Sequence, residues 1–194
     1  MATTIQEIAK QTTYLALSEA VLLAKGNMKT SQLTYQGRPI TFTIGEDLES
    51  VSVVFEPSVY GGTGEETRKG IVLKITEEDY DAISALEEWA RDNLRASNPN
   101  VDALWCPIAR KSDKYGTQLK AKINLQGRGV SWACKFYNGE KQLCDAPEDW
   151  RGATVSVALH VRGCYIQRNS LGLQIDVTHL QYKEQPATDD KCPF

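Results

Sequence analysis

Hydrophobic and polar residues alternate along much of this chain, and a period of two residues predicts β-strands. Residues 31–59 are rich in Thr, Val and Phe, and two alternating runs, 33–35 and 40–44, flank a short polar turn. This spacing predicts a β-hairpin. Residues 51–55 and 71–75 predict two more strands.

Alternation is strictest in the second half of the chain. Leu119, Ala121, Ile123 and Leu125 fall on one face of a predicted strand, and Lys120, Lys122 and Asn124 fall on the other. Residues 130–137 place Trp132, Cys134 and Phe136 opposite Lys135 and Tyr137, and Asn138-Gly139 predicts a tight turn after them. Residues 155–161 and 173–177 predict the last strands. The apolar faces are expected to fill the core, so the lysines point outward.

Two segments have helical rather than strand periodicity. Apolar residues in 3–24 recur near every 3.6 positions and stop at Gly26-Asn27, which predicts an N-terminal helix. Thr76 followed by three acidic residues predicts the start of a second helix. Its apolar face is Tyr80, Ile83, Leu86, Ala90 and Leu94, and it ends before Asn98-Pro99. The pairs Glu77-Glu78 and Glu87-Glu88 are expected on its solvated side.

These elements define a mainly β protein with helices, in the α+β class. The predicted architecture is an OB-like closed β-barrel with one well-marked covering helix and an N-terminal helix. Residues 1–184 form the single predicted domain, and residues 185–194 a flexible acidic tail. A β-sandwich gives a similar strand pattern, and alternation alone does not separate the two.

Charge is distributed unevenly over the 194 residues, whose net charge is −3. Residues 105–168 hold eleven basic and five acidic residues, a net charge of +6. Residues 1–104 hold nine basic and sixteen acidic residues, a net charge of −7. The basic block also carries aromatic residues at intervals. Cations for phosphates and flat rings for bases are what sequence-tolerant binding of single strands requires.

The candidate nucleic-acid site is drawn from this block. The residues predicted to meet phosphates are Arg110, Lys111, Lys114, Lys120, Lys122 and Lys135. The residues predicted to stack on bases are Tyr115, Trp132 and Tyr137. Core packing is the competing interpretation of Trp132, and a solvated strand face is that of the lysines.

Few features favour catalysis or a cofactor. Five cysteines and two histidines occur without a zinc-ligand spacing, so no metal and no cofactor is predicted. Residues 61–64 are glycine-rich but lack the lysine of a phosphate-binding loop. His160 is expected to be an ordinary strand histidine. With no signal peptide and no transmembrane run, the expected location is a reducing compartment, the cytoplasm or nucleus of a host.

Three stretches, YGTQLKAKI at 115–123, WRGATVSV at 150–157 and YIQRNSLGLQIDV at 165–177, resemble single-stranded DNA-binding proteins of phages and large DNA viruses. The resemblance implies an OB-fold whose groove coats single strands without sequence preference during replication, recombination or repair. It also implies a binding protein rather than an enzyme.

The last residues, TDDKCPF at 188–194, resemble the acidic tip of bacterial single-stranded DNA-binding proteins. That tip recruits replication and repair proteins, which implies a partner-binding role for Asp189, Asp190, Pro193 and Phe194. Lys191 and Cys192 depart from the family's pattern.

Two other interpretations stay open. The chain fits a coat or scaffold protein built as a β-sandwich, with the N-terminal helix as an assembly arm; a homo-oligomer is possible in either case. It also fits a protein that binds single-stranded RNA, since phosphate and stacking contacts do not depend on the 2′-hydroxyl.

Overall fold

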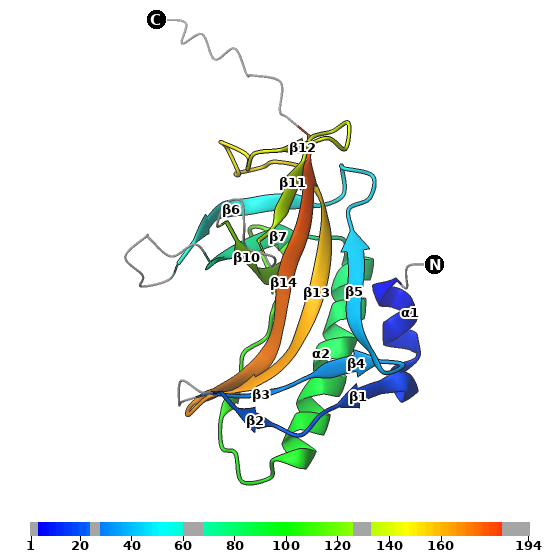
Figure 1. Ribbon diagram of the computed structural model, residues 1–194, viewed down its shortest axis with the longest axis vertical. Helices are drawn as coiled ribbons and strands as arrows, with labels where there is room; N and C mark the ends of the chain where they lie inside the picture. Colours follow the sequence, from blue (N-terminus) through cyan, green and yellow to red (C-terminus); the bar gives the residue numbers. More distant parts are fainter. Residues whose placement is uncertain (1–3, 24–27, 60–67, 126–132, 184–194) are drawn as a thin grey trace, which may run out of the picture.

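A long antiparallel hairpin forms the centre of the molecule. The computed structural model describes residues 4–23, 28–59, 68–125 and 133–183. The hairpin consists of β13 (Val155–Ile166) and β14 (Ser170–Tyr182). Figure 1 shows these two curved strands running along the molecule, with helix α2 (Glu77–Ser97) behind them. The mainly β class with one main helix is confirmed.

The other strands continue the sheet on both sides of this hairpin. The main path is β1-β4-β5-β13-β14-β10-β7-β6, and all neighbours along it are antiparallel except β10 and β14. β3, β8 and β11 pair with the hairpin at its ends, β2 pairs with β3, β9 with β10, and β12 with β11. The strand bounds are β1 Leu15–Leu17, β2 Val21–Leu22, β3 Lys29–Ser31, β4 Leu33–Tyr35, β5 Arg38–Ile44, β6 Ser52–Ser58, β7 Arg68–Lys74, β8 Leu104–Trp105, β9 Ala109–Ser112, β10 Gly116–Asn124, β11 Lys135–Tyr137 and β12 Leu143–Cys144.

The sheet is strongly curled, but its strand ladder is not closed within the described residues. β6, the last strand of the path, meets the segment that enters β13 at an isolated bridge between Ser52 and Thr154. The Val53 N–H donates to the Ala153 carbonyl (2.9 Å), and the Val155 N–H to that of Val51 (2.9 Å). The predicted closed barrel is therefore not confirmed.

The inner face of the sheet forms the core, as the alternation predicts. Leu119, Ala121 and Ile123 of β10 are buried, and so are Val155, Val157, Leu159 and Val161 of β13. They pack in one cluster with the buried side of α2. Asn124 lies on the same face as the lysines, as expected, where it lines a hollow with Arg68 and Asp176, but it is only 5% exposed. The Cys134 N–H donates to its backbone carbonyl (3.0 Å).

The long N-terminal helix predicted over 3–24 is wrong. Helix α1 spans only Ile5–Lys10 and is capped by Thr4. A 3₁₀ turn, Thr12–Tyr14, follows, and then β1, which pairs with β4. β-branched and aromatic residues at 12–14 have low helix propensity. The apolar residues beyond them satisfy strand alternation as well as a helical period, and pairing with β4 decides between the two.

Helix α2 begins and ends where the sequence predicts. The Thr76 hydroxyl accepts from the Asp79 N–H (3.1 Å), three acidic residues occupy the first turn, and Asn98 is the C-cap. Side chains of the predicted apolar face, including Ile83, Leu86 and Leu94, are buried. Favourable charge at the amino end and a single apolar stripe explain why this element is predictable.

Glu87 does not lie on the solvated side of α2, and that expectation is wrong. It is 5% exposed, and its carboxylate accepts from the backbone N–H groups of Ile108 and Ala109, both at 2.9 Å. Burial raises the pKa of Glu87, although these two hydrogen bonds oppose the shift. The carboxylate thus anchors the start of β9 to the helix.

A glycine lets β13 change partners along its length. β13 pairs with β5 up to Val161 and with β3 from Cys164 onward, with a register shift between Val161 and Gly163. Gly163 has φ of +122°, and a β-carbon there would collide with the carbonyl oxygen of Ser31. Only glycine fits this bulge without strain, and the bulge places Tyr165 on the outer face.

Replacing Glu87 with alanine leaves two buried N–H groups without acceptors. The expected loss is about 1–3 kcal/mol of unfolding free energy. Urea denaturation followed by circular dichroism measures it. The matched control is Glu88→Ala, which removes an exposed carboxylate paired with Arg91 and should change stability by less than about 0.5 kcal/mol. Equal stability of the two variants contradicts the anchoring role.

Candidate nucleic-acid interface

The outer face of the sheet is the side opposite the core, and its polar side chains come from adjacent strands. Lys122 of β10 lies in register with Asp176 of β14, which lies in register with His160 of β13. Gly70 of β7 pairs with Lys122 at the other end of this row. Strand alternation therefore aligns one charged or titratable side chain from each of three neighbouring strands.

A first hollow of about 290 Å³ lies on this face between β10 and the β13–β14 hairpin. Three predicted phosphate-binding residues, Arg110, Lys120 and Lys122, line it together with Tyr165 and Met28. Burial raises the pKa of Tyr165 to about 12. This hollow joins cations to one flat ring.

A second hollow, of about 200 Å³, is adjacent on β14. Its lining includes Arg68 from β7, Arg162 and His160 from β13, and Asp176. Arg68 Nη2 donates to Asp176 Oδ1 (2.8 Å), and Arg162 Nε donates to Asp176 Oδ2 (2.7 Å). One carboxylate therefore bridges two arginines at the centre of the outer face.

A third hollow, of about 260 Å³, lies near the end of β14. Tyr137 and His179 line it with Lys141, and their rings stack with centroids 6.1 Å apart and planes inclined by 21°. Lys135 lies opposite His179 in the register of β11 and β14.

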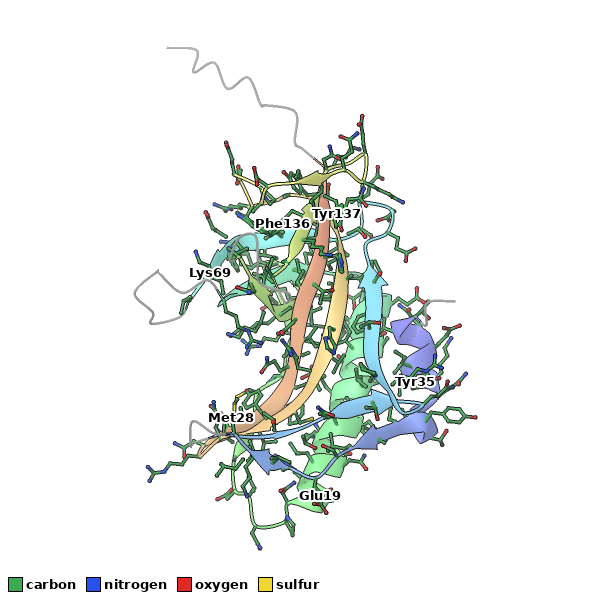
Figure 2. The ribbon with its side chains drawn as sticks, viewed as in Figure 1. Glu19, Met28, Tyr35, Lys69, Phe136 and Tyr137 are labelled. Carbon is green, nitrogen blue, oxygen red and sulfur yellow. The ribbon has the colours of Figure 1, made fainter. Side chains whose placement is uncertain are left out.

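The three hollows follow one another along β14. The first involves residues 173–175, the second 176–178, and the third His179 and Gln181. In Figure 2, Met28 of the first hollow and Tyr137 of the third lie toward opposite ends of the molecule. The outer face thus offers a row of contacts rather than a single pocket.

Burial and neighbouring cations both lower the pKa values of the central titratable residues. Burial lowers the pKa of Lys122, and the nearby charges of Lys120 and Arg68 lower it further. Burial also lowers the pKa of His160, with Arg162 adding to the effect. In both cases Asp176 acts in the opposite direction. The face is therefore net cationic around one carboxylate.

The structure does not bring Lys111, Lys114 and Tyr115 to this row. Lys111 alternates with Arg110 on β9 and points to α2, where its Nζ donates to Glu77 (2.8 Å) and lies 4.7 Å from the Tyr80 ring centre. Lys114 lies over the Tyr115 ring, which contacts Phe55 edge-on at 5.1 Å. Lys111 therefore lies beside α2, whereas Lys114 and Tyr115 lie beside Phe55 of β6.

Five predicted residues, Trp132, Asp189, Asp190, Pro193 and Phe194, lie outside the described residues. Their roles stay predictions.

Several residues of the row were not predicted as site residues. His160 and Arg162 follow from extending the outward face of 155–161 through the next positions of the strand. Tyr165 does not, because the bulge at Gly163 changes the alternation before it. Arg68 lies outside the basic block, and only the pairing of β7 with β10 brings it to Asp176. His179 falls beside a register shift of β14, so strict alternation does not place it.

No group of three or more metal-binding side chains occurs in the described part of the chain. The thiols of Cys134 and Cys164 are buried, and burial raises the pKa of each to about 12. Among the described helices, none combines the length and apolarity needed to span a bilayer.

No protein-family model and no curated protein match this chain. Solved structures, in contrast, do match it. One is gp2.5, a single-stranded DNA-binding protein encoded by bacteriophage T7, at 13% identity and a TM-score of 0.52, covering 77% of this chain and 96% of that one. Another is the single-stranded DNA-binding protein from bacteriophage Enc34 in complex with single-stranded DNA, at 12% identity and a TM-score of 0.50, covering 88% and 96%. The expected likeness to phage single-stranded DNA-binding proteins is thus confirmed for the fold.

The electrostatics of the outer face predict the titration of His160. Its pKa should lie below the ordinary value of about 6.5, because burial and Arg162 both disfavour the imidazolium. Two-dimensional NMR of the imidazole groups measures it. Arg162→Gln should raise the pKa of His160 and leave that of His179, which burial and Lys135 lower, unchanged. A wild-type pKa at or above the ordinary value contradicts this description.

Proposed function

We propose that this protein binds single-stranded DNA without sequence preference along its outer face. The observation that supports this most strongly is the row of three hollows along β14, with cations in each and rings in the first and third. The shared fold with two phage single-stranded DNA-binding proteins supports the same proposal.

Phosphates are held by the cations of the first two hollows. Arg110, Lys120 and Lys122 line the first, and Arg68 and Arg162 line the second. They lie on four different strands, so the rigid sheet fixes their spacing. Neutralising phosphates releases counterions from the strand, and affinity therefore falls steeply as salt rises.

Bases stack on the rings at the two ends of the row. Tyr137 presents a face already supported by His179, and Tyr165 lies among the cations of the first hollow. Every base has a flat face, so stacking tolerates any sequence and contributes roughly 1–3 kcal/mol per base.

The biological setting is part of the proposal. The protein acts as a non-enzymatic coat on single strands in replication, recombination or repair, inside a host cell. Its 1–184 domain is an OB-like barrel, for which the bridge between Ser52 and Thr154 gives support. Residues 185–194 recruit partner proteins through Asp189, Asp190, Pro193 and Phe194, as their resemblance to the bacterial acidic tip implies.

Fluorescence anisotropy with labelled oligo-dT of about 30 nucleotides tests the proposal, because that length covers one or more OB-type sites. Salt-sensitive binding that duplex DNA fails to displace is the expected result. Displacement by single-stranded RNA at equal concentration favours RNA as an equivalent ligand. No binding at low salt, together with large closed particles in size-exclusion chromatography, favours the coat or scaffold alternative.

Removing the outward lysines of β10 should weaken the binding of single-stranded DNA, because it removes part of the salt-dependent attraction to phosphates. Lys120→Ala with Lys122→Ala removes up to two phosphate contacts, so the slope of log K against log salt should fall by about 1.4. The control is Lys111→Ala, an exposed lysine that points to α2 and should leave the slope unchanged. If both variants changed the slope equally, the single-stranded DNA would not run over the lysines of β10.

Tyr137→Ala should reduce affinity for oligo-dT by about 1–3 kcal/mol and leave the salt slope unchanged, because a ring rather than a charge is lost. Tyr14→Ala is the control, since Tyr14 is an exposed tyrosine that contacts Tyr35 near β1, away from the three hollows. Titrations at several salt concentrations separate the two contributions. A steeper loss for Tyr14→Ala is inconsistent with stacking in the third hollow.

A further inference from the structure

Asp176 is unusual in its surroundings. Among the described residues that line the three hollows, it is the only one with a carboxylate. It lies midway along β14, in register with Lys122 on one side and His160 on the other. An acid at the centre of a surface that binds phosphates repels them, so the presence of Asp176 there needs a physical explanation.

Its contacts place it beneath the two arginines. The Asp176 side chain is 14% exposed, whereas those of Arg68 and Arg162 are 40% and 45% exposed. Each carboxylate oxygen accepts from one arginine, and Gln174 Nε2 is 3.4 Å from Oδ1. The carboxylate holds both guanidinium groups from below and leaves their other sides toward solvent.

The arginines keep most of their donors in this arrangement. A guanidinium carries five N–H groups, and each arginine spends one of them on Asp176. A phosphate therefore still finds donors on both. What Asp176 removes is net charge, because the three side chains together carry +1 instead of +2. Its opposing effect on the pKa values of Lys122 and His160 has the same origin.

We propose that Asp176 is a built-in counter-charge that limits the affinity of the outer face for single-stranded DNA. It repels each phosphate that enters the second hollow while it keeps Arg68 and Arg162 in place. A bound strand therefore leaves more readily than the number of cations alone implies, which suits a protein that must be removed from the strands it covers. This inference rests on the proposed function.

Asp176→Asn tests it, because asparagine keeps a carbonyl oxygen for one arginine and removes the charge. A carboxylate about 6 Å from a phosphate repels it electrostatically. Removing this repulsion by neutralising the side chain should tighten the binding of oligo-dT roughly three- to thirtyfold. The salt slope should become steeper as well. A purely structural role moves neither in this direction, since lost support for the arginines weakens binding.

Asp92→Asn is the matched control, with the same change in net charge at an exposed position of α2. That helix packs on the core side of the sheet, and screening over about 10 Å at 0.1 M salt should leave affinity unchanged. Asp176→Ser gives a second neutral side chain, and thermal unfolding confirms that each variant is folded.

The outcomes separate the two proposals. Wild-type protein that binds no oligo-dT at low salt overturns the proposed function and this inference with it. Wild-type protein that binds, with equal or weaker binding by folded Asp176→Asn and Asp176→Ser, overturns only the inference. Equal strengthening by Asp92→Asn also overturns it, because the effect then reflects the total charge of the chain.

Discussion

The antiparallel pairing of β13 with β14 is the constraint on which the rest of the structure depends. It fixes the register in which Leu159 and Val177 face the core while His160 and Asp176 face outward. Every other strand of the main path joins one side of this hairpin. A shift of one residue would move the apolar side chains to solvent and the charged ones into the core, so burial of the inner face also determines the composition of the outer face.

The outer face concentrates positive charge at a cost that the protein offsets locally. Lys122 and His160 are both harder to protonate than in water, because burial and neighbouring cations disfavour their charged forms. Asp176 relieves part of this repulsion in the free protein. A polyanion would relieve it too, since each phosphate stabilises the cations around it. The free protein thus keeps its cations close together at modest electrostatic cost. We propose that single-stranded DNA is the partner whose phosphates neutralise the remaining positive charge.

Local sequence signals predict some elements well and others not at all. The Thr76 cap and the alternation around Leu119 each depend on residues close in the chain, and both predictions hold. The hairpin between β4 and β5 also holds, with Gln36 and Gly37 at positive φ in its turn. The buried position of Glu87 depends on N–H groups more than twenty residues away. Arg68 reaches its carboxylate across 108 residues, which no local pattern encodes.

Photo-crosslinking of oligonucleotides that carry iodouracil, followed by mass spectrometry of the joined peptides, tests the central claim most directly. Iodouracil reacts with aromatic rings that stack on it, and tyrosines lie on both sides of this molecule. Binding of the DNA along the outer face predicts crosslinks to Tyr137 and Tyr165, at the two ends of the row along β14. Crosslinks confined to Tyr14 and Tyr35, beside β1 and β4, would show that the strand does not follow the outer face.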